Sequence, residues 1–191
     1  MKLRKILLLL IMSASIGTFA QDQKSLEARS QQMIDFGSDM KIDQFLDYTY
    51  PKAFTIVPRE TFKEMLTGMM KGDGYSLLLI KSPGNFKFSP IKKIKDSHYA
   101  VVDYDLSMKM VYDDPIPADE LEMMLAMFKE AMKSEDITYN PATRTLDIKR
   151  RAQLVAVADA TTNNLWTFLN NDGGPLLGAL LGEDVKKELG L

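Results

Sequence analysis

Two carboxylates on one predicted strand are the side chains best placed for acid–base chemistry. Apolar residues alternate with polar ones over 98–110, so Asp103 and Asp105 project from the same face, which Tyr99 shares. A carboxylate base beside a phenolic donor could abstract a proton and stabilise the oxyanion that results. The opposite face carries the core residues, however, which favours the alternative that Asp103 and Asp105 are solvated surface groups.

Other catalytic and metal-binding chemistries have few side chains to use. The chain contains no Cys, which excludes thiolate nucleophiles, disulfides and zinc–thiolate sites. His98 is the only histidine, and no nucleophile-elbow sequence accompanies it. The adjacent acidic pairs 113–114 and 183–184 lack the spacing of a calcium loop. We therefore predict no metal site and no cofactor.

Apolar side chains supply two candidate binding surfaces. Most of the 13 methionines lie at core spacing, where Met fills gaps. We favour this interpretation over the alternative that their thioethers bind Cu(I). Met123 and Met127 instead lie off the apolar face of their predicted helix and could form an adaptable groove for a ligand or partner. The tail residues either cover the sheet or the mouth of a cone, or form a partner or dimer surface. These tail candidates are Leu176, Leu177, Leu180 and Leu181.

The elements that would position these residues follow in a simple order. Helical spacing of apolar residues predicts helices over 23–37, from residue 42 to the proline at 51, and from Pro58 to the glycines at 72 and 74. Strand patterns follow at 75–80, 86–94, 98–110, 137–139, 145–159 and 165–169. An amphipathic helix near 117–133 interrupts them, and a tail helix over 176–189 ends the chain. This order predicts an α+β fold with the helices on one face of an antiparallel sheet.

The N-terminus indicates export. Lys2, Arg4 and Lys5 precede an apolar block over 6–12, and small residues follow before Gln21, which is typical of a secretory signal peptide at 1–20. The block is too short to span a bilayer, which needs about 20 apolar residues. We therefore predict a soluble periplasmic or extracellular protein whose single α+β domain covers 21–191, or, if the signal is kept, an anchored one.

Charge argues against nucleic acid as a partner. The 191-residue chain has a formal net charge of −2, which becomes more negative once the basic signal is removed. Nucleic-acid binders instead present strongly basic surfaces. The basic runs 92–95 and 149–151 are short and lie in predicted strands, so we interpret them as solvated faces.

Three segments resemble secreted members of the nuclear transport factor 2-like (cystatin-like, SnoaL-like) superfamily. They are 42–51 (IDQFLDYTYP), 58–66 (PRETFKEML) and 166–169 (WTFL). The resemblance implies a cone in which N-terminal helices pack in the concave face of a curved antiparallel sheet. The superfamily includes isomerases, hydrolases, dehydratases and transport adaptors, so fold alone does not define the activity. No residue set here matches the catalytic set of an enzyme branch.

The favoured hypothesis is an exported, non-catalytic module that binds a small apolar ligand or a protein partner, with a homodimer as one form. The first alternative is an isomerase- or hydrolase-like enzyme that uses Asp103 or Asp105 in the cone. The second is an envelope protein that assembles through its leucine-rich tail.

Overall fold

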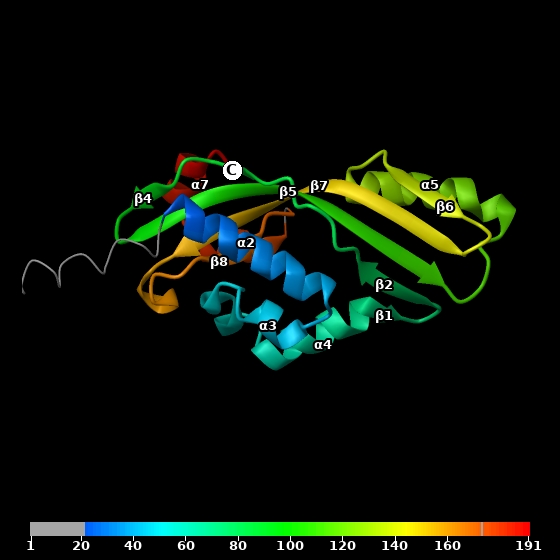
Figure 1. Cartoon of the computed structure of the whole chain (residues 1–191), viewed down its shortest axis with the longest axis horizontal. Helices are drawn as coiled ribbons and strands as arrows, with labels where there is room; N and C mark the ends of the chain where they lie inside the picture. Colours follow the sequence, from blue (N-terminus) through cyan, green and yellow to red (C-terminus); the bar gives the residue numbers. More distant parts are fainter. Residues whose placement is uncertain (1–21, 173) are drawn as a thin grey trace, which may run out of the picture.

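Two long antiparallel strands form the centre of the molecule (Figure 1). In this computed structural model, which describes residues 22–172 and 174–191, β5 (Ser97–Tyr112) pairs with β7 (Thr145–Ala158) along nearly their whole length. The predicted signal peptide at 1–20 lies outside the described residues. β5 and β7 correspond to the strands predicted over 98–110 and 145–159.

Six shorter strands complete an open, eight-stranded antiparallel sheet. Those on the β5 side are β1 (Lys71–Gly72), β2 (Tyr75–Leu79), β3 (Lys87–Phe88) and β4 (Lys92–Ile94); those on the β7 side are β6 (Ile137–Asn140) and β8 (Thr167–Asn170). The predicted strand over 86–94 is divided into β3 and β4 around Pro90, because proline has no N–H to donate to a neighbouring strand.

The helices form three groups around the sheet. The N-terminal group comprises α2 (Gln23–Ser38), α3 (Ile42–Leu46), the 3₁₀ helix η3 (Pro51–Thr55) and α4 (Arg59–Met70). The other two are the inserted α5 (Ala118–Met132) and the terminal pair, α6 (Pro175–Leu180) and α7 (Glu183–Leu189). A short 3₁₀ helix, η4 (Ala160–Thr162), connects β7 to β8. The fold class is therefore α+β, as predicted, with the N-terminal helices on the concave face of a cone-like sheet.

Two local features differ from the predicted elements. The N-cap of α2 is Asp22 rather than Ser25, because the Asp22 carboxylate accepts a hydrogen bond from the Ser25 amide at 2.7 Å. The tail contains two short helices instead of one, since the backbone is extended at Leu181 and Gly182. Glu183 and Asp184 then lie in the first turn of α7, where acidic side chains are favourable.

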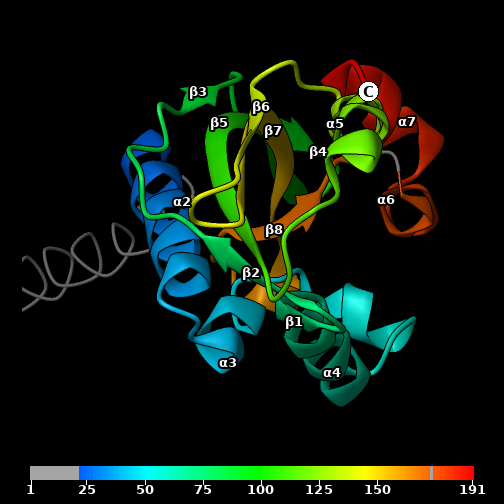
Figure 2. The same ribbon diagram turned by 90° about the vertical axis from the view of Figure 1, so that its right-hand side faces the viewer.

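The two faces of the central hairpin pack against different helices. Ala100, Val102 and Tyr104 on β5 pack with Leu26 and Met33 of α2. On the other face, α6 and α7 cover the hairpin (Figure 2). The residues packed there include Tyr99, Val155, Val157, Leu177, Leu181 and Val185.

A third cluster lies at the other end of the hairpin, beneath α5 (Figure 1). Met108 and Ile148 pack there with Leu125 and Phe128. These strand residues lie on the same face of the hairpin as the residues that contact α2. This face therefore packs against α2 at one end and against α5 at the other. Across the described ranges, none of the helices has the length and apolar character needed to cross a bilayer.

Candidate functional site

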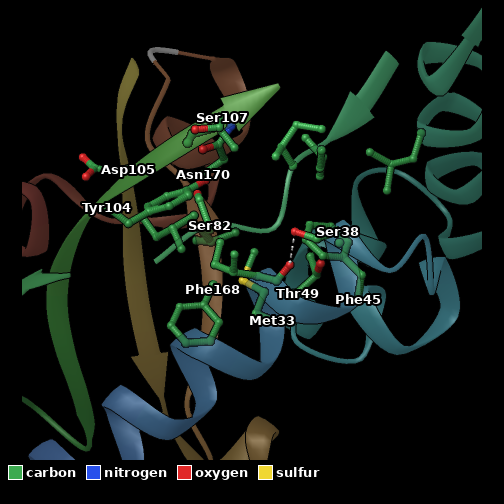
Figure 3. Close-up of a pocket in the computed structure, with 18 of the residues that line it drawn as sticks. Met33, Ser38, Phe45, Thr49, Ser82, Tyr104, Asp105, Ser107, Phe168 and Asn170 are labelled. Atoms are coloured by element: carbon green, nitrogen blue, oxygen red, sulfur yellow. Dashed lines mark hydrogen bonds between the residues drawn. The ribbon is translucent and has the colours of Figure 1, made fainter. Parts of the chain in front are cut away.

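A cavity of about 250 Å³ lies between the N-terminal helices and the sheet (Figure 3). Helices α2, α3 and α4 line one side, and β2, β5, β7 and β8 line the other. Most of the lining is apolar, and its principal side chains are Met33, Phe45, Leu66, Leu79, Leu154 and Phe168. The same cluster of core residues that holds α2 on the sheet therefore leaves an apolar space between them.

The close approach of α2 to this space depends on Gly37. A Cβ atom at this position would lie 3.3 Å from Leu79 Cδ1 and 3.4 Å from Phe45 Cδ2. Glycine thus lets the last turns of α2 come against α3 and β2 without a side chain entering the cavity.

Tyr104 is the most deeply buried polar side chain of the cavity wall. It is only 6% exposed, and its ring lies among the lining residues in Figure 3. Burial raises the pKa of Tyr104 to about 12, while the nearby charge of Arg150 acts in the opposite direction. Within the described chain its hydroxyl makes no hydrogen bond, whereas the Ser38 hydroxyl donates to the Ile34 carbonyl at 3.0 Å. Tyr104 is therefore a neutral phenol with an unused donor.

Asp103 and Asp105 lie on the opposite face of β5 from Tyr104. In Figure 3 the Asp105 carboxylate points away from the other labelled residues. It accepts hydrogen bonds from Asn85 at 2.5 Å and Arg151 at 2.7 Å, and these contacts lower its pKa. The Asp103 carboxylate accepts a hydrogen bond from Gln153 at 2.7 Å. A carboxylate with a lowered pKa is a weaker base, so this geometry gives no support to proton abstraction by Asp105.

Arg150 is the site residue that the sequence analysis missed. The run 149–151 was interpreted as a solvated face, and Lys149 and Arg151 are indeed exposed. Arg150, however, is half-buried, and its Nε atom is buried without a hydrogen-bond partner. It lies opposite Leu106 in the β5–β7 register, and therefore on the same face as Tyr104. The sequence of β7 could have indicated this placement, because Arg150 occupies a position in an alternating series that is otherwise apolar.

A second hollow adjoins the cavity on the side of Arg150. This groove of about 500 Å³ is lined by Arg150 together with Ser82, Leu106, Ser107 and Ser134. Ser82, Leu106 and Ser107 also line the apolar cavity, so the two spaces share a wall. An apolar chamber thus adjoins a charged groove, whose lining also includes Lys149, Arg151, Asp105 and Asp136.

The other predicted site residues lie elsewhere. Met123 and Met127 of α5 are 64% and 63% exposed, and they line a separate hollow of about 480 Å³ rather than the cavity. Leu177 and Leu181 are buried in the cluster under α6 and α7, so they present no surface to a partner. Leu176 and Leu180 are half-buried beside that cluster, and Leu176 also reaches the cavity wall. The structure therefore does not bring the methionine and leucine candidates together.

No known protein family, curated protein or solved structure matches the chain. The resemblance to the nuclear transport factor 2-like superfamily stays a prediction. In residues 22–172 and 174–191, no group of three or more His, Asp or Glu side chains is arranged to hold a metal ion. The site is accordingly described by its own residues: an apolar chamber, a buried phenol and an adjacent arginine.

Proposed function

We propose that this chain is an exported, non-catalytic binding protein that takes a small apolar molecule, or the apolar part of one, into the cavity between α2 and the sheet. The observation that carries the proposal is the cavity of about 250 Å³ with its largely apolar lining. Ligand pockets in proteins are mostly apolar and contain a few polar groups that orient the ligand. Tyr104 is such a group here.

The cost of leaving apolar side chains without packing partners supports the proposal. A cavity in a protein core lowers stability by about 24 cal/mol per Å³. This chain has no disulfide to offset such a loss, since it has no Cys. An apolar ligand in the cavity would restore the missing contacts and stabilise the folded state.

Binding without catalysis fits the charged groups near the cavity. The Asp105 carboxylate points away from it and has a lowered pKa, which makes this residue a poor general base. The Tyr104 phenol is protonated at neutral pH, as tyrosine ordinarily is, and its pKa of about 12 makes loss of the proton still less favourable. Tyr104 can orient a ligand, but neither group is suited to accept a proton from it.

Titration calorimetry with 1-octanol tests this proposal. We expect saturable binding at one site per chain, with a negative heat-capacity change from burial of apolar surface. The variant Leu66→Trp places a larger side chain at the cavity wall and should weaken binding at least about tenfold. Met65→Trp is the matched control, because Met65 is the adjacent residue on α4 and is exposed. It should leave the affinity unchanged.

Two results would contradict the proposal. One is the absence of saturable binding of 1-octanol to the folded wild-type protein. The other is an equal loss of affinity in both variants, since this would place the bound octanol outside the cavity.

A further inference from the structure

We infer that the ligand is an amphiphile with one anionic head group, a medium-chain carboxylate, whose alkyl tail fills the apolar cavity and whose head group pairs with Arg150. This inference rests on the proposed function and names the class of ligand for the same site. It is carried by the placement of Arg150, by its lack of a partner, and by the wall that the groove and cavity share.

Arg150 is placed where a charge is least expected. Over 97–112 and 145–158, all of which the structure describes, it is the only Lys, Arg, Asp or Glu on the face of β5 and β7 that packs against α2 and α5. Its neighbours along β7 on that face are Ile148 and Ala152, both buried. Burying a cation among apolar groups is unfavourable unless an anion pairs with it.

The basic neighbours of Arg150 are already paired. Arg151 contacts Asp105 at 2.7 Å, and Lys149 lies 3.9 Å from Asp136. The Arg150 guanidinium forms neither an ion pair nor a hydrogen bond with any residue in the described part of the chain. Of the three consecutive basic residues, Arg150 is therefore the one whose charge is left for an external anion.

The polar groups at the shared wall suit a carboxylate. Ser82 and Ser107 line both the cavity and the groove, and neither hydroxyl is hydrogen-bonded within the described residues. A guanidinium donates two parallel hydrogen bonds to a carboxylate, and the serine hydroxyls can donate to its remaining lone pairs. Asp105 also lies at this wall, but Arg151 and Asn85 already pair with its carboxylate.

The volume of the cavity limits the tail. A methylene group takes up about the volume of one liquid water, roughly 30 Å³, so a cavity of about 250 Å³ holds about eight carbon atoms. Octanoate is the matching probe. At pH 7.5 it is fully ionised, because a simple carboxyl has a pKa of about 4 to 5. The neutral probe of the same chain length is 1-octanol.

The test is titration calorimetry of the full chain at pH 7.5 with octanoate and, separately, with 1-octanol. Arg150→Met should weaken octanoate binding at least about tenfold, the loss expected for a hydrogen-bonded charge pair. It should change 1-octanol affinity less than twofold, which also shows that the variant is folded. Lys109→Met is the matched control, since it removes the same charge from an outward-facing position of β5 that lines neither the cavity nor the groove. It should change octanoate affinity less than twofold.

Arg150→Gln provides a second variant if Arg150→Met does not fold, and the same loss of octanoate affinity is expected. The inference is overturned if both Arg150 variants bind octanoate as tightly as wild type, or if Lys109→Met causes an equal loss. Binding of 1-octanol without binding of octanoate would contradict the inference of an anionic head group and leave the proposed function standing. If the wild-type protein bound neither probe, the proposed function would fail as well.

Discussion

Arg150 on β7 lies directly opposite Leu106 on β5, at the boundary between the apolar cluster under α2 and the one under α5. This pairing places a guanidinium within an otherwise apolar face, beside the cavity that Leu106 helps to line. Removal of the charge therefore has two consequences, one for ligand binding and one for stability.

Arg150→Met should stabilise the ligand-free protein. Replacing an uncompensated, partly buried charge with an apolar side chain of similar length is often neutral or stabilising, here by about 1 kcal/mol. Urea denaturation of the two proteins gives the free energy of unfolding directly. Lys149→Met, at an exposed position, should change it by less than about 0.5 kcal/mol. A clear loss of stability in Arg150→Met would show that Arg150 has a structural partner.

Tyr104 should make the protein sensitive to alkaline pH. Its folded-state pKa, about 12, exceeds the ordinary value of 10.0, so the folded state holds the proton more tightly. The corresponding stability is complete below pH 10 and is lost as the pH rises toward 12. Between pH 8 and 11 the wild-type protein should lose about 1 kcal/mol of folding free energy that Tyr104→Phe does not lose. Urea denaturation of the two proteins at both pH values would measure this difference. Equal losses of stability in the two proteins would contradict a raised pKa of the buried Tyr104.

The stability of the protein should depend on the hydrogen bond between Tyr50 and the buried Asp159. The Tyr50 hydroxyl donates to the Asp159 carboxylate at 2.7 Å, and both side chains are buried. Tyr50→Phe leaves one carboxylate oxygen with a weaker set of partners and should cost about 1 to 3 kcal/mol. Tyr48→Phe is the control, since it removes a hydrogen bond of equal length to Gln32 at an exposed site. Similar thermal stabilities for the two variants would argue against a structural role for the buried pair.

The tail leucines should behave as core residues. Leu181 is buried against the outer face of the sheet, so Leu181→Ala should destabilise the protein by about 2 to 5 kcal/mol. Leu165 is exposed, and Leu165→Ala should cost much less. Chemical denaturation with size-exclusion chromatography distinguishes this expectation from a dimer surface. A stable Leu181→Ala variant with an altered oligomeric state would support the dimer surface instead.

Much of the fold was predictable because its signals are local. Alternation in 98–110 predicted β5, a strand pattern over 145–159 predicted β7, and apolar residues at helical spacing predicted α2, α4 and α5. The single tail helix was wrong because extended backbone at Leu181 and Gly182 allows Glu183 to begin a new helix. Such a break depends on how α6 and α7 pack against the sheet, which no local pattern records.

The site was less predictable because it depends on distances between elements. The cavity arises where α2, α3 and β2 meet, and Gly37 contributes only by the side chain it lacks. Arg150 was predictable in principle, since the alternation of β7 assigns it to the apolar face. Its position in a run of three basic residues favoured a solvated surface, and only the contacts of each side chain distinguish Arg150 from Lys149 and Arg151.

A crystal structure of the protein grown with octanoate would test the central claim most directly. We predict the alkyl chain in the cavity among Met33, Phe45 and Phe168, with a carboxylate oxygen about 2.7–3.2 Å from an Arg150 nitrogen. Octanoate bound only at the exposed Met123 and Met127 of α5, beside an empty or collapsed cavity, would contradict the account.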